Sequence, residues 1–485
     1  MLQKKLVSGL FWVLLLNLIV KPFWILGIEV GVQNAVGAEA YGFYFAIFNL
    51  TYIFNILLDV GITNYNTRNI AQHPQLIEKH LSGILSLKLL LLGLYVLVTF
   101  SVALLMGYNS AQFHLLAILT FNQFLNSLIL YLRSNFEGLL LFRWDSVISV
   151  LDRLLMIVIC GFMLWAPAPF SILNSQFSIL HFAYAQTAAY LATVLLALVL
   201  LIQRTGLRRL RFNRLFSLAV LKQSLPFALL VLLMASYNRI DPLLLQQLLP
   251  ASVADIEVGV YASAFRLLDG LTMIAYLVSV PLLPVFAKLV NNSHQELNDT
   301  THWIFSLMMV FAIAAAVTLS SMADPLMSLL YNEHEVASAS VFRILIYGIV
   351  PIGTTYVFGT LLTAAGRLKE LNLLACGALL SGVVVNLLLI PRYGALGAAC
   401  ASLTAQGLMA VAQVIVAVRL FHFRIMPSYI LKMALFTLWI IMVNWLLPPM
   451  QWWWALLAAT AATFAAALPL GLLDIRHLKR LKIEN

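Results

Sequence analysis

Apolar runs long enough to cross a bilayer follow one another along almost the whole chain. A helix needs about 20 apolar residues to cross ~30 Å of hydrocarbon, and the connections between the runs are short and carry many of the charged residues. The pattern therefore predicts fourteen membrane-spanning helices. Their expected ranges are 9–35, 41–68, 81–107, 112–136, 144–165, 178–203, 218–249, 256–287, 301–331, 337–364, 368–390, 394–421, 428–447 and 452–473.

Composition indicates the same class of protein. Of 485 residues, 62% are hydrophobic and only 10% are charged, which is more apolar than a soluble core requires. We expect an all-α polytopic membrane protein. Residues 1–20 imitate a signal peptide, with Lys4 and Lys5 before an apolar stretch. The apolar pattern continues past Lys21 to Ala35, however, which favours a retained first helix.

Basic residues mark one side of the predicted membrane protein. Lysines and arginines gather at alternate connections, among them Arg133, Arg143 and Arg153 near the fourth and fifth spans and a dense group at 204–222. Because basic loops stay in the cytoplasm, both termini are predicted to be cytoplasmic. The net charge of +10 is spread as a collar, which favours contact with anionic membrane lipids over nucleic acid.

Two stretches of the chain repeat each other. GAEAYGFYFAIFNL (37–50) aligns with ADIEVGVYASAFRL (254–267), which pairs Gly42 with Gly259. Six spans in each half would enter the membrane in the same direction, so we expect two lobes around a central cavity, related by an axis along the membrane normal. The predicted parts are an N-lobe at 1–203, a basic cytoplasmic linker at 204–222, a C-lobe at 223–425, and two further helices with a basic tail at 426–485.

Cationic residues inside the predicted spans are the first candidate functional groups. A charged side chain near the bilayer centre costs about 2.5–3.5 kcal/mol, so it normally faces protein or a water-filled cavity. Cations that line a cavity could hold a diphosphate through charge-assisted hydrogen bonds. Lys88 lies near enough to the cytoplasmic end of its span to reach the interface instead. The substrate-binding candidates are Lys21, Arg239, Arg266 and Arg343.

Nearby carboxylates offer a second interpretation of the same cations. Arg239 could pair with Asp241, and Arg266 with Asp269 one turn further along the helix, in which case the charges only balance each other. Pro242 predicts a break in the span beside Arg239, because proline lacks the N–H that a helix interior needs.

Acidic residues in the spans are candidates for ion coupling. Asp59 could bind a proton or a sodium ion, or it could pair with Arg68 at the inner end of the same span. Both interpretations stay open at this point. The candidate ion-coupling residues are Asp59, Asp241, Asp269 and Glu29.

Motifs for catalysis and metal binding are not apparent in the sequence. Cys160, Cys376 and Cys400 are isolated in apolar segments, and none of the nine histidines is paired at a metal-ligand spacing. GAEAYGFY at 37–44 has the glycine spacing of a P-loop without its Lys and Ser/Thr. We therefore expect no enzyme, no metal site and no cofactor.

Four stretches carry a family resemblance. They are AYGFYFAIFNLTYIFNILLDVGITNYNTRNIA (40–71), YNRIDPLLL (237–245), VGVYASAFRLLDG (258–270) and the run 365–406, which contains VVNLLLIPRYGALGAACASLTAQ. In this order and spacing they resemble the oligosaccharide-repeat flippases, of the O-antigen and capsule type, in the multidrug/oligosaccharidyl-lipid/polysaccharide (MOP) exporter superfamily. The resemblance covers most of the chain up to about residue 425.

The resemblance implies a fourteen-helix, two-lobed transporter with a cationic cavity, which Lys21, Arg239 and Arg266 would fit. Its substrate would be an undecaprenyl-diphosphate-linked oligosaccharide, as used for lipopolysaccharide O-antigen and capsule, moved to the periplasmic leaflet of a bacterial inner membrane. The resemblance also implies coupling to H⁺ or Na⁺, and it makes a polysaccharide polymerase a candidate partner.

Three rival functions remain open. A drug/cation antiporter of the same superfamily would be expected to have twelve spans and a more acidic cavity. A membrane polysaccharide polymerase or acyltransferase would be expected to have a long outer loop or a His/Asp constellation. A packing subunit of an envelope assembly would not need several buried charges.

Overall fold

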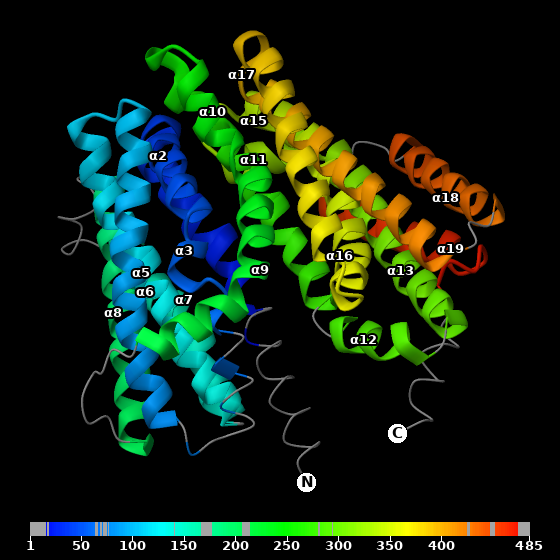
Figure 1. The fold of residues 1–485 in the computed structure, drawn as a ribbon. Coiled ribbons are helices and arrows are strands. Elements are labelled where there is room, and N and C mark those ends of the chain that lie inside the picture. Colours follow the sequence, from blue (N-terminus) through cyan, green and yellow to red (C-terminus); the bar gives the residue numbers. More distant parts are fainter. Residues whose placement is uncertain are drawn as a thin grey trace. The chain divides into compact units, whose positions relative to one another are not determined.

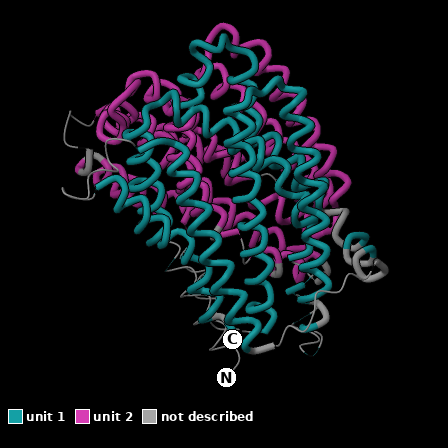
Figure 2. Tube along the Cα trace, turned by 90° about the vertical axis from the view of Figure 1, so that its left-hand side faces the viewer, with its two compact units in different colours: residues 1–259 teal, residues 260–485 magenta. Residues whose placement is uncertain are grey.

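The protein is built from helices in the computed structural model. The structure describes residues 16, 19–63, 66, 67, 70, 75, 77–139, 141–165, 177–205, 214–279, 282–292, 294–423, 427–446 and 452–473. No strand occurs in this part of the chain. The chain divides into two compact units, 1–259 and 260–485, which Figure 2 colours separately. The boundary falls inside α11 (Ala251–Ser279), whereas the predicted lobes part at 204–222 and stay a prediction.

Within the described residues, unit 1 contains the helices from η1 to α10 and the start of α11. Its helices α5, α6 and α8 pack side by side, and α7 packs against α6 and α8 (Figure 1). The bounds are η1, a π-helix (Trp24–Glu29), α2 (Val30–Ile53), α3 (Ile56–Asp59), α5 (Ile77–Leu105), α6 (Ser110–Gly138), α7 (Phe142–Trp165), α8 (Ile179–Thr205), α9 (Arg214–Arg239) and α10 (Asp241–Leu248).

Unit 2 contains the rest of α11 and the helices that follow it. Within it, α13 packs against α16, α18 and α19, and α16 packs along α17. The bounds are α12 (Leu282–Asn292), α13 (His294–Ser321), α14 (Ala323–Leu330), α15 (Glu335–Leu345), the 3-10 helix η4 (Ile346–Gly348), α16 (Ile349–Ala364), α17 (Leu368–Phe421), α18 (Pro427–Leu446) and α19 (Trp452–Ala467).

Membrane-spanning helices make up most of both units. Among the described residues, ten helices are long and apolar enough to cross a membrane, or eleven if the bent pair Ala228–Arg239 and Asp241–Leu248 forms one span. This confirms an all-α, multi-pass membrane protein, while the count of fourteen stays a prediction. Gly37 in α2 and Gly394 in α17 have φ angles of 84° and 53°. Each therefore kinks a long helix near a junction between predicted spans.

Proline divides one helix that the sequence pattern predicts as continuous. The expected span 301–331 is two helices, because α13 ends at Ser321 and α14 begins at Ala323. In a continuous helix the ring of Pro325 would clash with the carbonyl group four residues earlier, at Ser321. Pro242 acts in the same way on Asn238, and the predicted break beside Arg239 is present as a 51° bend between α9 and α10.

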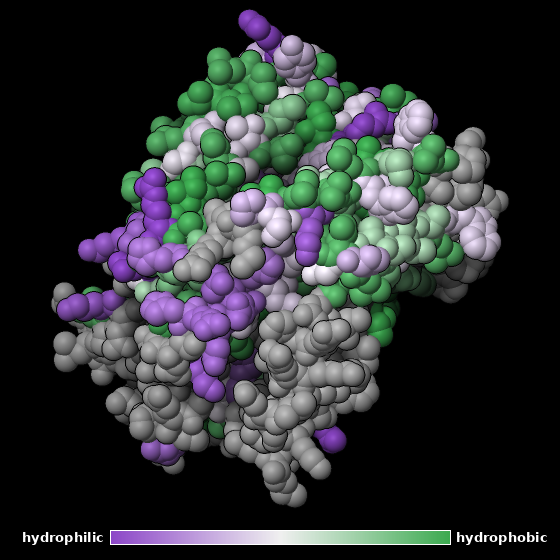
Figure 3. Space-filling view, turned by 90° about the vertical axis from the view of Figure 1, so that its right-hand side faces the viewer, coloured by the Kyte–Doolittle hydropathy of each residue, from purple (hydrophilic) through white to green (hydrophobic). Residues whose placement is uncertain are grey.

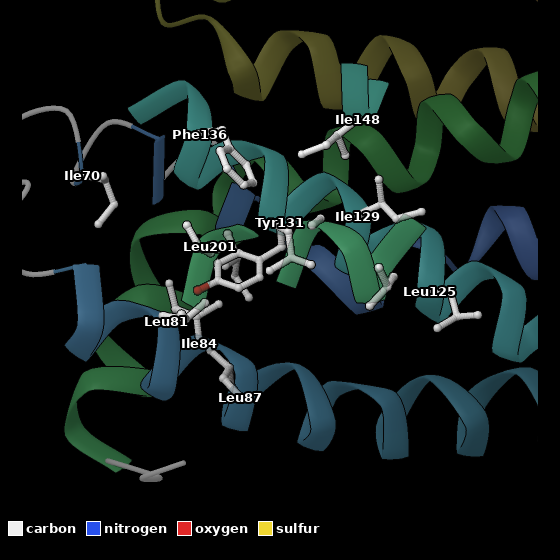
Figure 4. Close-up of a cluster of buried hydrophobic side chains, with 14 of the residues drawn as sticks. Ile70, Leu81, Ile84, Leu87, Leu125, Ile129, Tyr131, Phe136, Ile148 and Leu201 are labelled. Carbon is white, nitrogen blue, oxygen red and sulfur yellow. The ribbon is translucent and has the colours of Figure 1, made fainter. Parts of the chain in front are cut away.

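The core of unit 1 lies between α5, α6 and α8. Figure 4 shows its buried side chains, with Leu81, Ile84 and Leu87 on α5 facing Tyr131 of α6 and Leu201 of α8. The exterior is apolar as well, as expected for a surface against lipid tails. On the face shown in Figure 3, hydrophobic side chains cover a broad area and hydrophilic ones gather below it. Exposed large hydrophobic side chains include Leu97, Leu105, Leu195, Leu388, Leu438 and Trp445.

The two glycines paired by the internal repeat lie where α2 meets the start of α11, within unit 1. A Cβ atom on Gly42 would lie 2.6 Å from the backbone nitrogen of Gly259, and one on Gly259 would lie 2.7 Å from the carbonyl carbon of Ala38. Gln33 Nε2 donates to the Gly259 carbonyl oxygen at 3.1 Å. The two backbones are therefore in direct contact, an approach that only small residues permit.

Candidate functional site within the membrane spans

Arg239 lies at the break between α9 and α10, the position that the sequence pattern singles out. Its guanidinium carbon is 4.8 Å from the ring centroid of Tyr52, near the end of α2. This cation–π contact stabilises the positive charge of Arg239. Asp241, the first residue of α10, is buried, with 1% of its surface exposed. The bend thus holds a cation and a carboxylate two residues apart.

A row of aromatic rings connects this arginine with another one in unit 1. Neighbouring ring centroids along the row are 5.4 to 6.1 Å apart, within the range of favourable aromatic pairs. The row ends at Arg153 on α7, whose guanidinium carbon lies 5.5 Å from the last ring centroid. Starting from Arg239, the rings belong to Tyr52, Phe48, Tyr44, Phe182 and Trp24.

Arg153 lies well inside the span 143–165, although it is not among the cations that the sequence pattern singles out as candidates. Its Nη1 donates to the Tyr190 hydroxyl at 2.9 Å and forms an ion pair with Asp152 at 3.3 Å. Trp24, on which the guanidinium also stacks, donates from Nε1 to buried Glu29 at 3.1 Å. Glu29, one of the predicted ion-coupling residues, is therefore connected to Arg153 through Trp24.

The π-helix η1 carries two of the residues around Arg153. Trp24 and Glu29 are its first and last residues, and Lys21 lies one turn earlier, half-buried. A single π-helical turn inside an α-helix often marks a functional position, because it shifts side chains relative to the regular spacing. The structure thus places Lys21 and Glu29 on the same helical segment, close in sequence to the contacts of Arg153.

Asp59, one of the predicted ion-coupling residues, forms an ion pair with Lys88 of α5. Lys88 Nζ lies 3.2 Å from Asp59 Oδ1, and Thr63 donates its hydroxyl and its backbone N–H to the same carboxylate. Arg68, the partner considered from the sequence, lies outside the described residues. The expectation that Lys88 reaches the interface is wrong, because only 1% of its side chain is exposed. Its burial is possible because oxygen atoms of α3 and α6 surround its ammonium group.

In unit 2, the structure places Arg266 and Arg343 in different surroundings. Arg266 on α11 is buried, with 8% of its surface exposed, and Asp269 is half-buried three residues later. The side chain of Arg343 is 45% exposed, and its Nη2 lies 2.6 Å from Asp324 at the start of α14. Arg266 is therefore the more protected of the two predicted cations.

An apolar cavity of about 460 Å³ lies in unit 2 between α13 and α19. Leu271, Phe311 and Phe464 line it, with Thr318 among the few polar residues. No charged residue belongs to its lining, so it is not a candidate for binding a phosphate group. Metal-binding groups of three or more His, Cys, Asp or Glu residues do not occur in the part of the chain that the structure describes.

Comparison with known proteins places these features in a family. The family model described as polysaccharide biosynthesis protein matches residues 6–290. No curated protein matches the chain in sequence. Among solved structures, the chain is similar to the lipid II flippase MurJ in an inward closed conformation, with a TM-score of 0.68 and 15% identity over 96% of this chain and 99% of that chain.

Two further solved structures share the fold. A multidrug resistance MATE family transporter of the MOP superfamily, in its inward-facing conformation, has a TM-score of 0.67 and 16% identity over 82% of this chain and 94% of that chain. A MOP superfamily transporter from Pyrococcus furiosus has a TM-score of 0.56 and 16% identity over 85% of this chain and 94% of that chain. The family match spans more than half of the chain, and so the chain belongs to the polysaccharide biosynthesis protein family, with the fold of MOP superfamily transporters.

Proposed function

We propose that the protein is a flippase that moves undecaprenyl-diphosphate-linked oligosaccharide repeat units from the cytoplasmic to the periplasmic leaflet of a bacterial inner membrane. It would act as a transporter and not as an enzyme, with both termini in the cytoplasm. The repeat units would serve O-antigen or capsule synthesis, where a polysaccharide polymerase would use the product.

The observation that carries the proposal is the placement of Arg239 at a bend within a membrane span. Broken helices are tolerated at membrane depth where protein or a water-filled cavity satisfies the freed backbone groups. Arg239 stacks on Tyr52 there, and a guanidinium can hold a phosphate with two parallel hydrogen bonds. A diphosphate is the chemical group of such a lipid that this cation would recognise.

The other predicted cations would also bind the diphosphate headgroup. Buried Arg266 and half-buried Lys21 lie within membrane-spanning helices, where a charged side chain normally faces protein or a water-filled cavity. Arg343, which binds Asp324, would contribute only if that ion pair opened. In this proposal, the diphosphate and first sugars occupy a cationic cavity between the predicted lobes, and the lipid tail stays in the bilayer.

Transport would proceed by alternating access. The predicted lobes would rock around the bound headgroup, with the bend at Pro242 as a hinge. A coupling ion can drive this cycle only if it binds one orientation more tightly than the other. The candidate residues for H⁺ or Na⁺ are Asp59, Asp241, Asp269 and Glu29, all carboxylates in helices of the membrane region.

A drug/cation antiporter is the nearest alternative. The multidrug transporter shares the fold almost as closely as the lipid flippase does, so the fold alone does not separate the two functions. The cationic residues favour the flippase, because a cationic drug would be repelled by Arg239 and Arg266, whereas a diphosphate would be attracted.

Loss of Arg239 and Arg266 together is expected to stop transport. Each charge-assisted contact contributes about 1.5–3 kcal/mol, which corresponds to roughly 10- to 150-fold in affinity for the headgroup. The measurement is the translocation of a fluorescent oligosaccharide-diphosphate lipid in proteoliposomes by Arg239→Ala/Arg266→Ala, with Arg367→Ala as control. Arg367 is exposed and pairs with Glu370 three residues away, so its loss should leave transport unchanged.

Two results would contradict the proposal. The first is undiminished translocation by the folded double variant. The second is extrusion of a cationic dye by the wild-type protein with no translocation of the lipid, which would support the antiporter.

A further inference from the structure

In the second predicted span (41–68), the helix α3 ends at Asp59. This early end leaves a backbone carbonyl oxygen that can accept a hydrogen bond from a side chain. After α3, Val60 and Gly61 have φ angles of 46° and 81°, so the helix cannot continue through them. The last carbonyl groups of a helix lack intrahelical donors. One of them, the carbonyl oxygen of Leu58, instead accepts from Lys88 Nζ at 3.0 Å and from Ser127 Oγ at 3.3 Å.

Three kinds of oxygen surround the Lys88 ammonium group. Besides the Leu58 carbonyl, Nζ contacts the Asp59 carboxylate at 3.2 Å and the Ser127 hydroxyl at 2.8 Å. We refer to Leu58, Asp59, Lys88 and Ser127 as the Lys88 site. The ring centroid of Tyr131 lies 5.7 Å from Nζ and adds a cation–π contact. One positive charge thus faces one carboxylate.

The Asp59 carboxylate is held in place independently of Lys88. Thr63 donates its hydroxyl to Asp59 Oδ1 at 2.5 Å, and its backbone N–H lies 3.3 Å from both carboxylate oxygens. The side chain of Asp59 is 24% exposed, whereas that of Lys88 is 1% exposed. Removal of the lysine would therefore leave the carboxylate oriented and reachable.

This set of oxygens is one that binds small monovalent metal cations. In broken membrane helices, carbonyl groups at the ends of half-helices coordinate sodium ions, and hard cations favour carboxylate, carbonyl and hydroxyl oxygens. An ammonium group is a compact positive charge with three donors, so it can satisfy the same oxygens. Lys88 thus supplies, on a side chain, the positive charge that a metal ion would bring from solution.

We infer that the Lys88 site is a monovalent-cation site that the protein fills with its own lysine. The ammonium group takes the place of Na⁺ or K⁺ and holds the end of α3 against α5 and α6. This inference deepens the ion coupling of the proposed function and rests on it for its role in transport. For Asp59, named above as an ion-coupling candidate, this means that Na⁺ would act there only in a state in which Lys88 has left the site.

The test is whether a metal cation binds when the lysine is shortened. Purified Lys88→Ala is compared with wild type by thermal unfolding in NaCl, KCl and choline chloride at equal ionic strength. Na⁺ or K⁺ is expected to raise the unfolding temperature of the variant by about 2–4 °C beyond any rise in wild type, with saturation. Adding Ser127→Ala to the variant removes one ligand and should abolish the rise.

The control is Lys369→Ala. Lys369 is exposed, so this variant loses the same charge outside the Lys88 site and should respond to the salts as wild type does. Equal responses of Lys88→Ala and wild type to the three salts would overturn the inference. Lys88→Ser is the second variant, because its hydroxyl would add a ligand. If both variants failed to fold even in saturating NaCl and KCl, the site would be an ordinary ion pair and the inference would be wrong.

No substrate takes part in this experiment. A failure of the cation response therefore leaves the flippase proposal standing, and a failure of lipid translocation leaves the cation site standing.

Discussion

Gly259→Ala is expected to destabilise the protein severely, although it adds a single methyl group. The new Cβ would lie 2.7 Å from the carbonyl carbon and 3.0 Å from the Cα of Ala38, both backbone atoms of α2. Overpacking of a core, which displaces side chains and shifts the backbone, costs about 1–3 kcal/mol. Here a whole helix would have to move, so we expect the upper end of that range or more. Gly42→Ala should behave alike, because its Cβ would overlap the backbone of Asp255.

The measurement is the thermal unfolding of the purified variants in detergent, together with the fraction that elutes as a single species. Gly93→Ala and Gly407→Ala are matched controls, since a Cβ at either position meets nothing within 4 Å. Because alanine is favoured over glycine in helices, these controls should be as stable as wild type or slightly more so. If Gly259→Ala unfolded at the same temperature as Gly93→Ala, the close contact would be refuted.

Removal of Arg133 is expected to have the second largest effect on stability. Arg133 Nε donates to Asp145 Oδ1 at 2.7 Å, and Nη2 donates to Oδ2 at 3.2 Å, which is a bidentate pair between α6 and α7. The Asp145 side chain is almost fully buried. Loss of one partner from a buried pair typically costs about 3–5 kcal/mol, because the remaining charge is left without compensation. Arg133→Met should therefore lower the unfolding temperature strongly.

A double variant separates the charge from the packing. Arg133→Met/Asp145→Asn removes both charges, and it should regain most of the stability that Arg133→Met loses. Arg367→Met is the control, since its pair with Glu370 is exposed and such pairs contribute about 0–1 kcal/mol. Equal losses in Arg133→Met and Arg367→Met would show that the α6–α7 pair does not stabilise the protein.

Helix positions were the most predictable part of the fold. The expected spans 112–136, 144–165 and 178–203 correspond to α6, α7 and α8 within a few residues. In a bilayer every backbone polar group must be satisfied within the segment, so a long apolar run fixes a helix without reference to its neighbours. The break at Pro242 was predictable for the same reason, because proline acts on its own helix.

The surroundings of the charged residues were less predictable. Arg153 lies within the expected span 144–165, but its neighbours Arg143 and Asp152 make it resemble part of the basic group at the start of that span. Its position in the spanning helix 143–165 could have been found from span length alone, but its stacking on Trp24 could not. Lys88 shows the limit most clearly, because its three oxygen partners come from two other helices.

The sequence by itself determined that this chain is an all-α, multi-pass membrane protein, resembles the oligosaccharide flippases, and carries Arg239 at a helix break. These properties follow from apolar run length, charge position and proline placement, all of which act over a few turns of one helix. Only the tertiary structure decided that Gly42 meets Gly259 across two helices, that Arg239 stacks on Tyr52, and that Lys88 binds Asp59. Such contacts join residues far apart in the chain, and their partners depend on how helices pack, which no local pattern specifies.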